Sequence, residues 1–171
     1  MTRREISRKW EASGFLMNKL GTHEGGCLCG TVRYKTEGDP KYVGICHCRY
    51  CQLRTGSAFG ISVYFDSAQV TLLRGETSLK SFKYPTESGR ESQLQFCSDC
   101  GTTLLWSSQW RPKWTGIGGG TFDPPTFWYK IEREVFCRSK ANFIYTYVND
   151  QFDTGPVYTP LNEEALRLKG G

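Results

Sequence analysis

Seven of the eight cysteines in this chain fall into three short clusters. The clusters are Cys27 and Cys29; Cys46, Cys48 and Cys51; and Cys97 and Cys100. Cysteine thiolates are soft ligands, and pairs one or two residues apart are typical of protein sites for zinc. The pattern therefore predicts a zinc protein.

The spacing within each cluster indicates how the sulfur atoms meet. Two cysteines separated by one residue lie on the same side of an extended strand, so Cys27 and Cys29 can reach one ion together. The two-residue spacing from Cys97 to Cys100 suits a tight turn that closes around a metal. A glycine directly follows each of these pairs, namely Gly30 after Cys29 and Gly101 after Cys100. Glycine permits the backbone conformation of such a turn.

Joining the first and third clusters gives a complete set of four sulfurs, which is typical of a closed structural zinc site. The middle trio of Cys46, Cys48 and Cys51 leaves one coordination position open, as in sites that accept water or substrate. Three alternatives stay open on spacing alone. The thiols could form disulfides, could hold a single zinc with the others free, or could divide differently between two ions.

A zinc ion held by three thiolates carries a net charge of about −1, which weakens it as a Lewis acid. Such a site is better suited to hold a further thiol as its reactive thiolate. His47 alternates with Cys46 and Cys48, so we expect its side chain to point away from the ion and to support the ligands from behind. Cys137 stands alone, and we expect a small buried hydrophobic residue there.

Charge and composition narrow the function classes. The formal net charge is +5; two zinc sites with four and three thiolates would change it by −2 and −1, which gives +2. That balance does not indicate binding to nucleic acid. No apolar run approaches the ~18 residues of a membrane span, and no secretory signal is evident at the start. We therefore expect a cytoplasmic protein, in which disulfides are disfavoured.

The elements that must position the cysteines are mostly short strands. Alternating or β-branched runs predict strands at 31–35, 41–45, 60–65, 70–73, 79–84, 92–96 and 102–106, with late strands at 131–136 and 143–148. One helical turn is expected from Cys51 to Leu53, and a short helix over 161–168. The glycine-rich stretch 115–121 predicts a tight, closely packed turn. The fold class is mainly β and antiparallel, with few short helices.

A single domain is expected over residues 23–171, since the length suits one core. Residues 1–22 are basic and differ from the rest, which predicts a poorly ordered N-terminal extension.

The cysteine motifs resemble those of the glutathione-dependent formaldehyde-activating enzymes, a family that also includes centromere protein V. The resemblance rests on the stretches 25–30 (GGCLCG), 46–51 (CHCRYC), 96–101 (FCSDCG), 55–59 (TGSAF) and 120–124 (GTFDP). It covers residues 24–143, most of the chain. It implies an Mss4-like β fold with two zinc ions, the outer cysteine pairs holding the structural zinc and the middle trio holding the zinc linked to activity.

The resemblance also implies a reaction. The family's named activity joins glutathione and formaldehyde into S-hydroxymethylglutathione, a carbon–sulfur lyase reaction in reverse. Arg49, Arg54 and Arg138 are candidates to pair with the carboxylates of glutathione, and Thr55, Gly56 and Ser57 are candidates to line the substrate pocket.

Two positions depart from the family pattern. Many members carry a histidine at the opening of the late strand and a proline–tryptophan pair after it, whereas this chain has Glu134 and Asn142-Phe143. These departures bear on the identity of the substrate more than on metal binding. Three hypotheses follow: a zinc-dependent carbon–sulfur lyase acting on glutathione adducts, a zinc enzyme for another small electrophile or imine, and a noncatalytic glutathione-binding or zinc-stabilised binding module.

Overall fold

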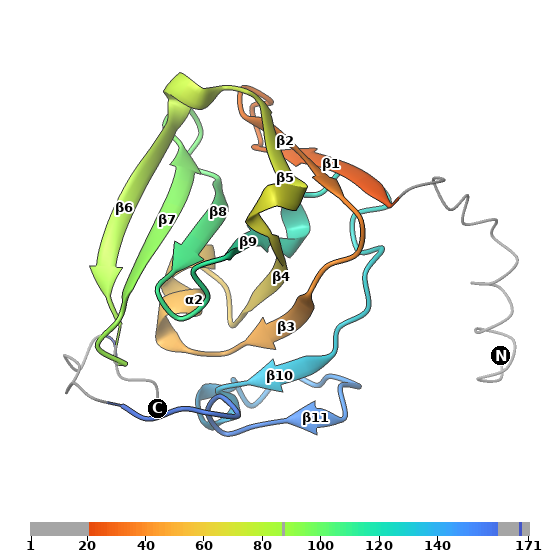
Figure 1. Ribbon diagram of the computed structural model, residues 1–171. Helices are drawn as coiled ribbons and strands as arrows, with labels where there is room; N and C mark the ends of the chain where they lie inside the picture. Colours follow the sequence, from red (N-terminus) through yellow and green to blue (C-terminus); the bar gives the residue numbers. More distant parts are fainter. Residues whose placement is uncertain (1–20, 87, 161–167, 169–171) are drawn as a thin grey trace, which may run out of the picture.

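The computed structural model describes residues 21–86, 88–160 and 168 of the 171-residue chain, and within them it contains two β-sheets and one α-helix (Figure 1). The prediction of a basic extension over 1–22 falls almost entirely outside these residues, as does the helix predicted over 161–168. In the described part of the chain, no helix has both the length and the apolar character needed to cross a membrane.

The strands follow one another at short intervals along the chain. Their bounds are β1 Thr22–Gly26, β2 Arg33–Glu37, β3 Tyr42–Cys46, β4 Gly60–Asp66, β5 Val70–Arg74, β6 Leu79–Pro85, β7 Glu91–Cys97, β8 Thr103–Ser108, β9 Trp114–Gly118, β10 Arg133–Val135 and β11 Asp150–Gln151. Helix α2 spans Arg49–Thr55, and short 3-10 helices span η1 Ser67–Gln69, η2 Glu76–Ser78, η3 Gly119–Thr121 and η4 Cys137–Ser139. The mainly β prediction is confirmed.

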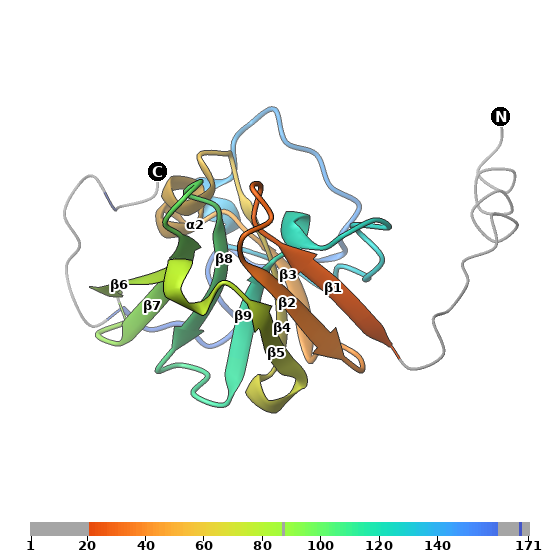
Figure 2. The same ribbon diagram turned by 90° about the horizontal axis from the view of Figure 1, so that it is seen from above.

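The smaller sheet has the order β1-β2-β5, and the larger has the order β11-β10-β3-β4-β9-β8-β7-β6 (Figures 1 and 2). Most neighbours are antiparallel, as the short connections predict. Strand β10 is the exception, because it pairs in parallel with both β3 and β11. A parallel pairing requires a long connection, and here the chain returns to β3 only after passing through the rest of the sheet.

The hydrophobic core is built from the inward-facing residues of both sheets. The central residues of β3 are buried in succession, Val63 and Phe65 of β4 are buried beside them, and Tyr34 of β2 packs in the same cluster from the smaller sheet. Each such side chain contributes ~1.5–3 kcal/mol by leaving water. The core fixes the register of β3, and with it the position of Cys46 at the end of that strand.

The glycine-rich stretch 115–121 is a strand where the sequence predicts a turn. Most of it belongs to β9, in the middle of the larger sheet, and only its last residues form the 3-10 helix η3. The close packing that the sequence predicts is present: a Cβ atom at Gly116 would lie 2.0 Å from Nε1 of Trp106. Glycine marks a strand position where a large side chain crosses the backbone.

The late strand predicted over 143–148 is wrong. The segment is irregular, and the last ladder in the described chain is β11 at Asp150–Gln151. Its alternating pattern has another origin: Tyr145 and Tyr147 are exposed, while Thr146 between them donates a hydrogen bond to the buried carboxylate of Glu134. One anchored hydroxyl, rather than a strand partner, sets the direction of the segment.

Candidate metal centres and ligand pocket

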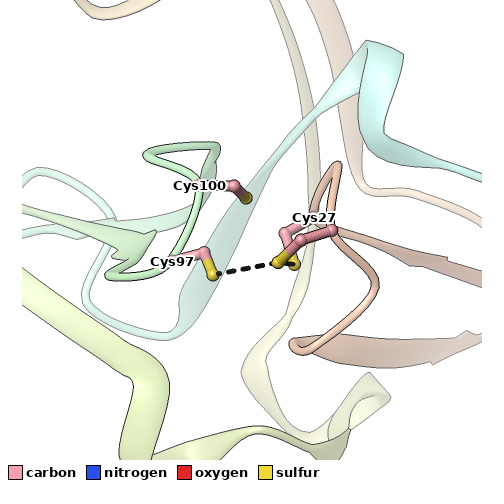
Figure 3. Close-up of side chains that lie close together, drawn as sticks. Cys27, Cys97 and Cys100 are labelled. Atoms are coloured by element: carbon pink, nitrogen blue, oxygen red, sulfur yellow. Dashed lines mark hydrogen bonds between the residues drawn. The ribbon is translucent and has the colours of Figure 1, made fainter.

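Four cysteines converge between the two sheets. Cys27 and Cys29 lie in the loop that follows β1, Cys97 ends β7, and Cys100 lies in the turn after it (Figure 3). The Sγ atoms of Cys27 and Cys29 are 3.4 Å apart, and those of Cys29 and Cys97 are 3.7 Å apart. Sulfurs around a tetrahedral zinc ion lie ~3.8 Å apart, given Zn–S bonds of ~2.3 Å. The cluster therefore fits a four-sulfur zinc site.

Two glycine-ended turns shape this cluster. Gly30 and Gly101 have φ angles of +76° and +73°, in the left-handed region that glycine adopts without strain. The Gly30 amide donates to the carbonyl of Cys27, and the Gly101 amide donates to the carbonyl of Cys97. The two turns therefore point both pairs of thiols toward one place, and the turn geometry that the sequence predicts is confirmed.

The middle trio forms a second group. Cys46 is the last residue of β3, Cys48 is the extended residue before helix α2, and Cys51 follows one helical turn later. The three sulfur atoms lie within 4.8 Å of one another. The chain stays extended through Cys48, so Cys46 and Cys48 face the same side, and the helix then brings Cys51 round to them. Three sulfurs in this arrangement fit a zinc ion with one position left for a ligand.

Arg54 stands beside the trio. Its Nη2 atom lies 3.7 Å from the sulfur of Cys51, and its guanidinium stacks 3.7 Å from the ring centre of Trp106. Hydrogen bonds from the Cys46 and Cys48 thiols, with a smaller contribution from the charge of Arg54, hold the pKa of the Cys51 thiol well below its ordinary value. Arg54 is one of the three arginines expected as candidates to pair with glutathione, and its guanidinium lies against the sulfur of Cys51.

A buried polar network lies behind the trio. His47 and Glu134 are both fully buried, and Nε2 of His47 lies 2.6 Å from Oε1 of Glu134. Lys140 and Thr146 donate to the other carboxylate oxygen at 3.1 and 2.6 Å. His47 lies outside the group of three sulfurs and pairs with Glu134, and its support of the metal ligands stays a prediction. The contact between His47 and Glu134 was not predicted, because it depends on the parallel pairing of β10 with β3.

Replacing Glu134 by glutamine should lower the free energy of unfolding by ~3 kcal/mol, because Lys140 would lose its buried counter-charge. Burial raises the pKa of Glu134, but the bonds from Thr146, His47 and Lys140 outweigh it and the pKa is lowered. Its stabilisation is thus complete above ~pH 4.5 and is lost as the pH falls through the lowered pKa. Urea unfolding at pH 7 measures the effect, with Glu132→Gln as the exposed control. A similar midpoint for both variants would contradict it.

A large cavity of about 690 Å³ opens beside the trio, and Cys46, Cys48 and Cys51 all line its wall. Aromatic side chains from β3, β4 and β8 form much of the rest, including Tyr42, Tyr64 and Trp106. Cavities of this size suit small-molecule ligands. The three sulfurs therefore border a space large enough for a peptide-sized thiol.

The predicted substrate contacts divide between two places. Arg49, Arg54 and Arg138 line the large cavity. Thr55, Gly56 and Ser57 are exposed at the C-terminal end of helix α2 and are not part of its lining. The hydroxyl of Thr55 lies within hydrogen-bond distance of the carbonyls of Cys51 and Phe59. Thr55 also lines a separate cavity of about 520 Å³. Their role as substrate contacts stays a prediction.

The sequence model of the glutathione-dependent formaldehyde-activating enzymes matches residues 22–139, more than half of the chain. The chain belongs to this family. The resemblance stated from the cysteine motifs is thereby confirmed, and with it the Mss4-like β fold that the family has. Membership supports chemistry related to glutathione and the activation of formaldehyde in general.

A crystal structure of a Rhodobacter sphaeroides protein is similar to this one. The two chains are 20% identical, the TM-score is 0.50, and the match covers 62% of this chain and 95% of the other. At this identity the likeness concerns the fold alone.

The division of the seven clustered thiols matches the one that this family implies. All eight cysteines of the described residues are free thiols. Cys137 is half-buried at the start of η4, less enclosed than the sequence predicts for a small core residue. It lies in neither sulfur group.

Two arginines of the large cavity were missed by the sequence analysis. Arg111 lies in the turn before β9, and Arg133 begins β10. Both line the cavity, and both stack over the ring of Tyr42, at 4.7 and 6.0 Å from its centre. They are distant from every cysteine motif in the sequence, so the motif gives no signal for them.

Proposed function

We propose that this protein is a zinc-dependent carbon–sulfur lyase that acts on glutathione adducts, forming S-hydroxymethylglutathione from glutathione and formaldehyde or making a related adduct. One observation carries the proposal: the incomplete set of three sulfurs, Cys46, Cys48 and Cys51, lines a cavity of about 690 Å³. The closed set of four lies outside the lining of that cavity. Two zinc ions per chain, one structural and one linked to activity, are part of the proposal.

The sulfur donors fit zinc at both places, and zinc at the trio would supply one thing: it would hold the glutathione sulfur as its thiolate at neutral pH. The charges of the chain's own residues would favour binding of this thiolate. Three thiolates and a dipositive ion sum to −3 + 2 = −1, and the guanidinium of Arg54 beside Cys51 brings the local sum to 0. Lower negative charge at the trio favours the entry of an anionic thiolate.

The remaining groups bind and orient the ligand. Arg49 and Arg138, on the wall of the cavity, are suited to the carboxylates of glutathione. Tyr64 accepts a hydrogen bond from Nε1 of Trp106 at 3.0 Å, because an indole can only donate. The proton of the Tyr64 hydroxyl therefore stays available for an oxygen atom in the cavity. Burial raises the pKa of Tyr64, so the hydroxyl keeps that proton.

The reaction needs no oxidant. The sulfur adds to the aldehyde carbon, so a C–S bond forms while the π bond of the C=O group breaks. The electron pair moves to the aldehyde oxygen, which takes up the proton that the thiol has released. The hydrogen bond from Tyr64 would stabilise the charge that develops on this oxygen.

Exchange of ¹³C-formaldehyde between its free form and its glutathione adduct, followed by NMR, tests the proposal. The adduct forms without an enzyme, so the purified protein should increase the exchange rate at least ~10-fold over the uncatalysed rate. The Cys137→Ser variant, which keeps both sulfur groups, is the matched control and should match the parent. Binding of glutathione without faster exchange would instead identify a noncatalytic glutathione-binding module. No binding at all would leave a zinc-stabilised domain or an enzyme for another electrophile or imine.

A further inference from the structure

The large cavity carries more positive charge than glutathione requires. Its described lining contains no aspartate or glutamate and six arginines, namely Arg49, Arg54, Arg90, Arg111, Arg133 and Arg138. Glutathione presents two carboxylates, and its ammonium group cancels part of their charge. With Arg54 placed on the trio, the cavity still has more guanidinium groups than the tripeptide has carboxylates.

Arg111 and Arg133 lie together at one end of this cavity. Both guanidinium groups lie over the ring of Tyr42. The Arg111 guanidinium also stacks 4.4 Å from the ring centre of Trp114. The Arg133 guanidinium packs 5.7 Å from the ring centre of Phe152. Flat aromatic walls hold each guanidinium in place while leaving its N–H groups to bond elsewhere.

Neither guanidinium finds an anion in the part of the chain that the structure describes. Nη1 of Arg111 and Nε of Arg133 are buried without a hydrogen-bond partner there, and no carboxylate of those residues lies within 4.0 Å. A buried donor left unpaired costs ~1–3 kcal/mol, and more when it is charged. An anionic ligand at the cavity wall would give both guanidinium groups the counter-charge that the described residues do not supply.

Strand β3 connects these arginines to the reacting centre. Tyr42 begins the strand and Cys46 ends it, and residues 42, 44 and 46 share one face. A Cβ atom at Gly44 would lie 2.2 Å from the hydroxyl of Tyr42, so the tyrosine side chain lies over Gly44, along the strand. The Cα atoms of Tyr42 and Cys46 are ~13 Å apart along the strand, and Arg133 pairs in register with Gly44, midway between them. An anion held here is a short carbon chain away from the trio.

We infer that Arg111 and Arg133 form an anion subsite, and that the electrophile carries a carboxylate or phosphate group of its own. The substrate class is then an anionic aldehyde, whose adduct with glutathione bears at least one negative charge more than S-hydroxymethylglutathione. This inference rests on the proposed function and specifies its substrate. The bond changes are those described for formaldehyde: the C–S bond forms, the C=O π bond breaks, and the thiol proton ends on the aldehyde oxygen.

Pairs of aldehydes matched in length test the subsite. In the parent with saturating glutathione, kcat/KM for glyoxylate should exceed kcat/KM for acetaldehyde by at least ~10-fold. Succinate semialdehyde and butanal are the alternative pair, with the same expected ratio. A factor of ~10 is the effect of one charge-assisted hydrogen bond. Arg111→Gln and Arg133→Gln should each reduce this preference toward 1. Lys113→Gln removes an exposed charge two residues from Arg111 and should leave the preference unchanged.

A binding measurement separates the subsite from turnover. The parent should bind S-carboxymethylglutathione at least ~10-fold more tightly than S-ethylglutathione, and both arginine variants should lose the difference. If that holds while no aldehyde reacts, the subsite stands and the proposed lyase function is wrong. If the parent shows no preference in either assay, the subsite is wrong. If the variants weaken glutathione itself and keep the aldehyde preference, the anion is a carboxylate of glutathione, and the inference is overturned.

Discussion

Replacing Cys97 by serine should reduce the free energy of unfolding by ~4 kcal/mol and the melting temperature by ~10 °C or more. Cys97 is fully buried, and its sulfur meets that of Cys29 across 68 residues of sequence. The four sulfurs join a loop of the smaller sheet to a turn of the larger one. Loss of one ligand opens this closed loop and leaves the thiols of Cys27, Cys29 and Cys100 without their metal.

Thermal and urea unfolding of the purified variant measure this effect, and elemental analysis should show the zinc content falling from two toward one per chain. Cys137→Ser is the matched control, since Cys137 lies in neither sulfur group. If Cys97→Ser melts like the control, the four-sulfur group is not a structural zinc site, and the division of the thiols has to be changed.

Replacing Cys48 by serine should separate ligand binding from folding. Cys48 directly precedes α2, and its sulfur lies within 4.8 Å of those of the other two members of the trio. We expect zinc content to fall toward one per chain and glutathione affinity to fall at least ~100-fold, because the charge that stabilises the bound thiolate is lost. The melting temperature should fall by less than in Cys97→Ser, since the trio spans only a short segment and closes almost no loop.

Calorimetric titration of glutathione into the parent and the Cys48→Ser variant, with the released protons measured in two buffers, checks this result. The parent should release about one proton per thiol bound near pH 7, because a thiol with an ordinary pKa of ~8.5 binds as its thiolate. Equal affinity in parent and variant would mean that glutathione does not bind through the trio. The cavity would then serve another ligand, or glutathione in a different orientation.

The convergence of the cysteines within each cluster was predictable, because it depends on local geometry. Cys46 and Cys48 lie on one side of an extended segment, and Cys51 follows within one helical turn, so spacing alone brings the three together. Gly101, with its positive φ angle, is likewise fixed by its own residue type. Such features need only the few residues on either side.

The rest of the cavity depends on contacts between distant segments. Glu134 reaches His47 across 87 residues, and it does so only because β10 enters the sheet in parallel beside β3. Arg133 is carried to the cavity by the same pairing. No local pattern indicates that a three-residue strand will pair in parallel with one so far away, so the sequence analysis found neither the buried network nor the anion subsite.

The glycine-rich strand shows a second reason for failure. Gly116 was expected in a turn, because glycine is most common there, but it lies in a strand beneath Trp106. Glycine permits both a left-handed turn and a close approach by a large side chain. Only the position of Trp106 decides between them, and that position is set by the pairing of β8 with β9.

Strand β10 lies late in the chain, so it is synthesised long after β3, the strand with which it pairs. Strand β3 and helix α2 leave the ribosome well before Arg133, and β4, the antiparallel partner of β3, follows them closely. A nascent chain therefore carries its metal-binding thiols for many seconds, at ~5–20 residues per second, before the ligand cavity is closed. Chains that stop short of residue 133 would keep every metal ligand and lack the far wall of the cavity. Such chains would expose the three sulfurs of the trio without Arg133 and the later residues that enclose the cavity.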